Sequence, residues 1–205
     1  MKSGLSRFWR NEDGVITVEA TIAIPFVALA FCAIYVFFDV YRVNTASQKA
    51  AYIVADNISR QTSAVNEAYV EGLNTLHDIL ARTRSATTIR VSSIGWSDRN
   101  NGFIAIWSVN TGTGPILTST DVNGPMSDRM PRIPQGETFL LVETAVDYVP
   151  LFRVGIGEQT FRQAIVTRPR FAPQVAFDDG SRLLQQNLGQ ASCNDGPNLC
   201  NPGES

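Results

Sequence analysis

The chain has 205 residues, of which 44% are hydrophobic and 18% are charged. This length and composition suit one folded domain with a long anchor and exclude a chain that is disordered throughout. The formal net charge is −2, and without a concentrated basic run it argues against nucleic acid as a partner.

An apolar run at residues 15–38 dominates the N-terminal part of the sequence. It contains one acid, Glu19, and no base. A helix of about 20 residues crosses the hydrocarbon core of a bilayer, so the run predicts a transmembrane helix. The polar residues 1–14 before it carry Lys2, Arg7 and Arg10. These bases favour a cytoplasmic leader, with everything after Asp39 exported.

Three simpler interpretations of the run compete with this one. A cleaved secretory signal has a shorter apolar core and a small-residue cleavage site, whereas Asp39-Val-Tyr-Arg42 follows here. A buried core helix does not account for the basic segment before the run. A plain uncleaved signal anchor explains every residue except Glu19, because a carboxylate in a membrane span is unfavourable unless it is paired or near the interface.

Glu19 is the fifth residue after Gly14, counted from Val15, in the segment Glu12-Asp-Gly-Val-Ile-Thr-Val-Glu-Ala-Thr-Ile-Ala-Ile-Pro25. This segment resembles the processing site of type IV prepilins. Within that class it is similar to the N-terminal signature of the TadE/TadF-like minor pilins (pseudopilins) of tight-adherence, or Flp, pili. Residues 45–59 resemble the small-residue helix that follows the span in those proteins, with TadF the closer match. Ala20 stands where the major pilin usually has an aromatic residue, which favours a minor subunit.

This resemblance implies a role in pilus biogenesis and adhesion. A prepilin peptidase would cut the leader 1–14 after Gly14 and leave an α-amino group on Val15. Glu19 would neutralise such a group on a neighbouring helix, since opposite charges attract strongly in a low dielectric. The protein would be a single-pass inner-membrane protein with its N-terminus in the cytoplasm and its C-terminal domain in the periplasm or the extracellular pilus. Its partners would be the peptidase, other pilin-like subunits on the N-terminal helix, the inner-membrane assembly platform and membrane lipid.

Residues 39–62 are expected to extend the transmembrane helix, because no glycine or proline interrupts 39–61. A narrow stripe of small and apolar residues recurs there at helical spacing: Val43, Ser47, Ala50, Val54 and Ile58. The stripe suits either a partner helix or the protein's own globular part, and the sequence does not choose between them.

Residues 63–170 are expected to form a periplasmic α+β domain, so that the whole chain has a pilin-like layout of a long helix, a second helix and a small antiparallel sheet. The second helix is predicted at 65–84, with His77 at its surface or boundary. Its apolar face would consist of Tyr69, Leu73, Leu76 and Leu80.

Period-two patterns predict strands at 87–96, 102–109, 138–149 and 159–168. The turn residues 98–102 indicate that the first two strands form a hairpin. The segment 110–136 is rich in glycine and proline, and we expect a long exposed loop there.

Residues 171–205 are expected to be an irregular tail with a short helix at 180–188. Cys193 and Cys200 flank a turn-rich segment, and their spacing suits a disulfide-closed loop in an oxidising compartment. A zinc site is the alternative, but it needs further ligands, and the only histidine, His77, is distant in sequence.

The sequence lacks the phosphate-binding, metalloprotease, serine-hydrolase and redox-cysteine motifs that would indicate an enzyme. We therefore expect no catalytic residues, no cofactor and no metal. An uncleaved single-pass periplasmic sensor or scaffold is the alternative function. A membrane-tethered hydrolase is a third class, which requires a pocket with convergent polar groups.

Overall fold

The computed structural model describes residues 15–83, 85–97, 101–124, 126–127, 130–131, 133–134, 136–181 and 183–185. These residues divide into two compact units. The first contains the residues up to Arg42 together with Pro150–Glu158, and the second contains Val43–Val149 and the residues from Gln159 onward. The helix α2 contributes to both units.

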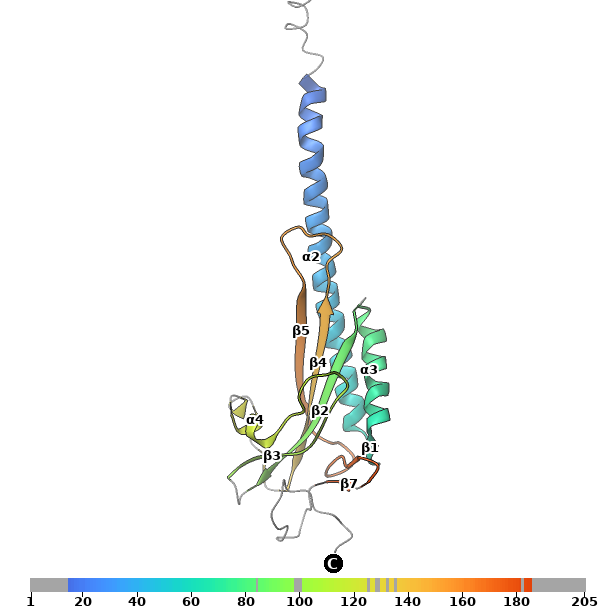
Figure 1. Ribbon diagram of the computed structural model, residues 1–205, viewed down its shortest axis with the longest axis vertical. Helices are drawn as coiled ribbons and strands as arrows, with labels where there is room; N and C mark the ends of the chain where they lie inside the picture. The colour runs from blue at the N-terminus through green and yellow to red at the C-terminus, as the bar shows by residue number, and fades with distance from the viewer. Residues whose placement is uncertain are drawn as a thin grey trace, which may run out of the picture. The chain divides into compact units, whose positions relative to one another are not determined.

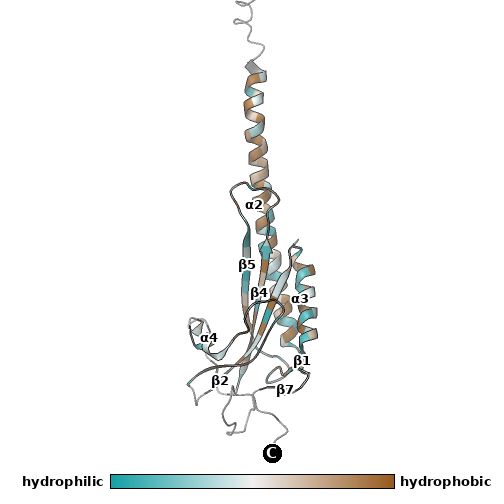
Figure 2. Cartoon of the chain, in the orientation of Figure 1, coloured by the Kyte–Doolittle hydropathy of each residue, from teal (hydrophilic) through white to brown (hydrophobic). Residues whose placement is uncertain are grey.

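Helix α2 comprises Val15–Ser59, with Pro25 inside it (Figure 1). The predicted span and its predicted extension are therefore one continuous helix. In the first unit the side chains of residues 17–31 are all exposed. Figure 2 shows that this part of α2 is largely apolar. A helix that is apolar on every side is typical of a membrane span or of the core of a large protein.

The second unit is built on a four-stranded antiparallel sheet with the strand order β3-β2-β4-β5. The strands are β2 (Thr87–Ser97), β3 (Gly102–Asn110), β4 (Thr138–Tyr148) and β5 (Gln159–Thr167). All four predicted strands are confirmed, with each end within one residue. The predicted hairpin of β2 and β3 is also confirmed, while residues 98–100 of its turn lie outside the described part of the chain.

Helix α3 (Glu67–Ala81) is shorter than the predicted 65–84. The side chain of Asn66 accepts a hydrogen bond from the amide of Tyr69 at 2.9 Å and caps the start of the helix. Arg82, with a left-handed backbone at φ 50°, ends it. The face that is buried differs from the predicted one and consists of Val70, Leu73, His77 and Ala81.

The main hydrophobic core lies between α2, α3 and one face of the sheet (Figure 1). The small-residue stripe from Val43 to Ile58 supplies the α2 side of this interior, and none of its five residues is more than 5% exposed. Of the two roles that the sequence left open for the stripe, the structure shows packing against the protein's own domain. Because every side chain on the stripe is buried, residues 43–58 do not offer this face to a partner helix.

The expected exposed loop at 110–136 is partly wrong, because this connection folds over the other face of the sheet. It contains the helix α4 (Ser119–Asn123) and buries Leu117, Val122 and Ile133 in a second apolar cluster. This cover explains why β4 is buried on both faces over its first five residues instead of alternating. The sequence did contain a signal for α4, since Thr118 and Asp121 form a capping box.

Helix α4 also covers the outer edge of β3. The side-chain amide of Asn123 accepts a hydrogen bond from the Phe103 amide at 2.8 Å and donates one to the Phe103 carbonyl at 2.6 Å. The hydroxyl of Ser119 accepts a bond from the Ala105 amide at 3.0 Å. Side chains of α4 therefore form hydrogen bonds with backbone groups of β3 that could otherwise pair with a strand of another chain.

The predicted irregular tail contributes to the fold over its described residues. A small sheet joins β1 (Val65–Asn66), β6 (Phe177–Asp178) and β7 (Leu183–Leu184) in the order β1-β6-β7. The predicted helix at 180–188 is wrong at β7, which pairs antiparallel with β6. Gly180, at φ 85°, has the left-handed backbone that a tight turn between them requires.

Candidate functional site

The first candidate site is the N-terminal half of α2. Phe26 and Phe31 are 71% and 70% exposed, although burying one such side chain stabilises a protein by about 1.5–3 kcal/mol. By length and composition, α2 is the one helix in the described part of the chain that could cross a membrane. These properties are compatible with a single-pass membrane protein.

Glu19 lies on this exposed surface, in the second turn of α2. Positions 15 and 19 are four residues apart and therefore on the same face of the helix. Gly14 and the leader 1–14 lie outside the described residues, as do Cys193 and Cys200, so the processing site and the disulfide remain predictions. The thiol of Cys32 is free and half-buried.

A groove of about 440 Å³ on the second unit is a site that the sequence did not predict. It lies on the sheet face that points away from the main core, beside the residues covered by α4. Side chains from three strands and the end of a fourth line it, with Gly114 and Pro115 on one side: Thr88, Arg90, Asn110, Glu143 and Arg162. The lining therefore mixes polar with apolar side chains, such as Ala145 and Ala164, and carries both signs of charge.

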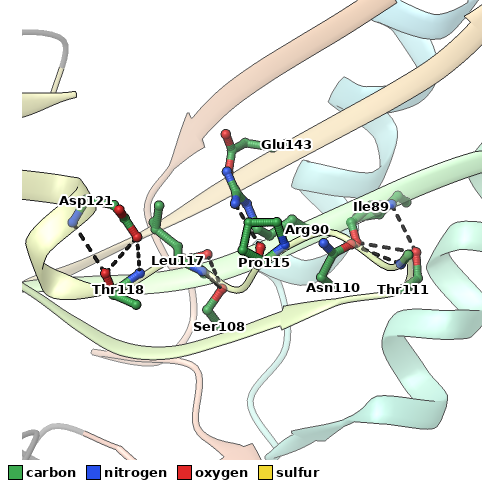
Figure 3. A network of polar contacts seen from close by, with 12 residues as sticks. Ile89, Arg90, Ser108, Asn110, Thr111, Pro115, Leu117, Thr118, Asp121 and Glu143 are labelled. Atoms are coloured by element: carbon green, nitrogen blue, oxygen red, sulfur yellow. Dashed lines mark hydrogen bonds and ion pairs between the residues drawn. The ribbon is translucent and has the colours of Figure 1, made fainter. Parts of the chain in front are cut away.

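Arg90 and Glu143 both line this groove, and Figure 3 shows their ion pair. They are directly opposite each other on β2 and β4, and the Arg90 Nε lies 2.6 Å from the Glu143 Oε2. The Arg90 Nη1 also donates to the carbonyl of Pro115 at 3.0 Å. This second hydrogen bond ties the connection after β3 to the Arg90 side chain in the groove.

Further hydrogen bonds hold that connection in place (Figure 3). The Thr111 hydroxyl accepts a bond from the Ile89 amide at 3.0 Å, and the Leu117 amide donates to the Ser108 hydroxyl at 2.9 Å. At Gly112 a Cβ atom would lie 2.8 Å from the Cγ2 of Thr88, so only glycine fits without a shift. The wall of the groove is therefore ordered by contacts with β2 and β3.

Next to this wall, hydrogen bonds from Thr118 change the pKa of the Asp121 carboxylate. The Asp121 carboxylate accepts bonds from the Thr118 hydroxyl at 2.6 Å and from the Thr118 amide at 3.0 Å. These bonds stabilise the charged form and lower the pKa of Asp121 below its usual value. The capping box is thus maintained by an ionised carboxylate.

The lining of the groove is limited in the chemical groups that it offers. Its described lining contains no histidine, cysteine or serine, and its one carboxylate, Glu143, is paired with Arg90. Among the described residues, no group of three or more histidine, cysteine, aspartate or glutamate side chains is placed to hold a metal ion. The sequence could not predict this site, because the charges of Arg90 and Glu143 are 53 residues apart and meet only through the register of the sheet.

His77 is not at the surface as expected but is fully buried where α3 faces α2. Burial lowers the pKa of His77, and this effect exceeds the opposing influences of the Ser47 backbone and of Asp78. Neither ring nitrogen makes a hydrogen bond. The position is internal, so His77 belongs to the packing of the domain and to neither candidate site.

Comparison with protein-family models, with curated proteins and with solved structures finds no match to this chain. The resemblance to minor pilins therefore depends on the N-terminal residues alone. The fold adds a mixed α+β architecture with a long apolar N-terminal helix.

Proposed function

We propose that the protein is a TadE/TadF-like minor pilin, or pseudopilin, for biogenesis of a tight-adherence (Flp, type IVb) pilus. The observation that carries this proposal is the continuous helix Val15–Ser59, whose exposed apolar half carries a single exposed carboxylate, Glu19, at the fifth position after Gly14. The subunit would have a pilin-like fold and no enzymatic activity of its own. Before assembly it would be held in the inner membrane, with its C-terminal domain in the periplasm.

The two halves of α2 would have different roles in assembly. The stripe face of residues 43–58 packs in the protein's own core, so we assign lateral packing with other pilin-like helices chiefly to residues 17–31, which are exposed on every side. There Glu19 would pair with the α-amino group of a neighbouring subunit and fix the register of the packed helices. The charge pair requires a processed terminus at Val15, which makes cleavage the first point to test.

The test is the N-terminal sequence of the membrane-extracted protein, from cells with and without an active prepilin peptidase. A mature terminus at Val15 that depends on the peptidase is expected. An intact Met1 in both strains, or a cut beyond Phe38, would contradict the proposal.

The groove around Arg90 and Glu143 favours a second candidate, an uncleaved periplasmic sensor or scaffold that binds a polar ligand. This candidate keeps residues 1–14 as a cytoplasmic stub, so the same sequencing experiment separates the two functions. A membrane-tethered hydrolase has less support, because the described lining of the groove offers no unpaired acid or base for general catalysis.

A further inference from the structure

The connection between β4 and β5, Pro150–Glu158, belongs to the first unit together with the helix residues up to Arg42. The ring of Phe152 contacts the ring of Tyr35 edge-on, with 6.1 Å between the ring centroids and 73° between the planes. Figure 1 shows this connection beside α2. A loop more than a hundred residues further along the chain is therefore packed against the apolar helix.

The contact between Tyr35 and Phe152 lies next to the apolar part of α2, before Asp39, which is the first charged residue of the helix after Glu19. Tyr35 precedes Asp39 by four residues, which corresponds to about 6 Å along a helix. Asp39 forms an ion pair with Arg42 at 2.8 Å and marks the polar end of the span. If Asp39 lies among the lipid headgroups, then Phe152 reaches the boundary with the acyl chains, where interfacial segments bury their apolar side chains by about 5–10 Å.

The loop exposes apolar side chains at this level. Leu151 and Phe152 are 54% and 42% exposed, in spite of the Phe152–Tyr35 contact. The neighbouring helix residues present more aromatic surface: Phe37, Phe38 and Tyr41 are each more than 60% exposed. Of these residues, tyrosine is the type enriched at the membrane–water interface, and the phenylalanine rings add apolar surface beside it. Arg153 is 90% exposed, so its charged end can remain in water while its stem lies along the apolar surface.

We propose that Leu151 and Phe152 insert into the lipid interface beside Tyr35, giving the protein a second membrane contact in addition to its span. The occupant of this exposed apolar surface is lipid, because the surface is continuous with the apolar surface of the span itself. The inference rests on the proposed membrane location of α2 and goes beyond it by assigning a lipid contact to a loop outside the helix. The contact would limit rotation of the span about its own axis, since two points of attachment define an orientation that one helix does not.

The test places benzoylphenylalanine, a photoreactive phenylalanine analogue, at position 152 of the full-length protein in cell membranes. A second label at position 151 covers the case in which the first disturbs the contact with Tyr35. The matched control is the same label at Phe171, an exposed phenylalanine of the second unit. After irradiation, mass spectrometry identifies what has been attached to each labelled peptide.

We expect phospholipid adducts at positions 151 and 152 to be several-fold more abundant than at 171. An adduct with another protein, or lipid labelling no greater than at 171, would overturn the loop contact while leaving the span intact. Extraction of the unlabelled protein from membranes by alkaline carbonate would instead overturn the proposed span. The two failures are thus distinguishable.

Discussion

The imidazole of His77 lies against the backbone of Ser47, where α3 faces α2, and both side chains are completely buried. The Ser47 hydroxyl and both ring nitrogens of His77 have no hydrogen-bond partner. A buried polar group without a partner lowers the stability of a protein by about 1–3 kcal/mol. The contact between α2 and α3 thus buries polar groups, and burial disfavours the protonated form of His77.

The stability of the protein should fall as the pH is lowered through the ordinary pKa of histidine. Burial depresses the folded-state pKa of His77, so below about pH 6.5 the unfolded chain binds a proton that the folded chain does not. Stability is thus fully present above this pH. It decreases by up to about 1.4 kcal/mol per pH unit until the folded-state pKa is reached. Urea unfolding of the full-length protein in detergent measures this slope. A series from about pH 7.5 to about pH 5 covers roughly one to two units on either side of the ordinary pKa of histidine.

The variant His77→Leu provides the control for this pH dependence. Leucine has a similar volume and no polar atoms, so we expect unchanged or increased stability at pH 7 and a smaller slope in the acidic range. An unchanged slope in the variant would assign the pH dependence to other groups. Asp78, the neighbouring charge that favours protonation of His77, should be left intact in this comparison.

Because the stripe buries one face of α2, a substitution by leucine should affect stability on that face and have little effect on the exposed face. Ala50 is 1% exposed, and a leucine there adds volume to a packed interior, which should destabilise the domain by about 1–3 kcal/mol. Gln48 is exposed on the same helix, so Gln48→Leu should change the stability little. Thermal unfolding of both variants compares the two faces directly. Equal stability of the two variants would indicate that the stripe is not part of the core in solution.

The sequence predicted the fold best where a regular alternation of apolar and polar residues reflects burial against a single core. The strands β2, β3, β4 and β5 were predicted to within one residue. The five residues of the stripe on α2 are all buried, although the sequence left open what they pack against. Failures occurred where burial depends on partners distant in sequence. Leu117 and Ile133 looked like loop residues because the apolar face that they cover, near Phe139, exists only after the sheet has formed.

The same limit applies to the candidate sites. Glu19 was identifiable because a carboxylate in an apolar run violates a local rule. Arg90 and Glu143 violate no local rule, and only the pairing of β2 with β4 brings them together. His77 was misplaced because the periodicity of α3 also fits a face rotated by one residue, which includes Tyr69 and Leu76 instead.

The groove yields a prediction about the Arg90–Glu143 ion pair. Both side chains are less than a quarter exposed, so Glu143→Gln should lower the stability by about 1–2 kcal/mol, between the values for exposed and buried pairs. The exposed pair Arg153–Glu158, at 3.9 Å, serves as the control, and Glu158→Gln should have little effect. Chemical denaturation measures both variants. Equal effects would show that burial in the groove does not strengthen the pair.

The segment after β5 should be required for full stability, although the sequence predicted an irregular tail. The indole Nε1 of Trp107 donates a buried hydrogen bond to the carbonyl of Val175 at 2.9 Å. Trp107→Phe keeps an aromatic ring in the core but leaves that carbonyl unpaired, which should cost about 1–3 kcal/mol. Hydrogen exchange should also rise at the amide of Val65, which donates to the carbonyl of Ala176. Unchanged exchange there would mean that the tail is held independently of Trp107.

The last prediction concerns the carboxylate in the span. Glu19→Gln keeps the shape of the side chain and removes its charge, so cleavage after Gly14 should continue while association with pilin-like subunits weakens. Loss of one partner from a desolvated charge pair typically costs about 2–5 kcal/mol, which is enough to reduce co-purification and pilus-dependent adhesion severely. Thr21→Val is the matched control, because the Thr21 hydroxyl donates only within the helix, to the Thr17 carbonyl at 2.7 Å. If Glu19→Gln and Thr21→Val assemble equally well, Glu19 does not pair with a neighbouring terminus, and its place in the span needs another cause.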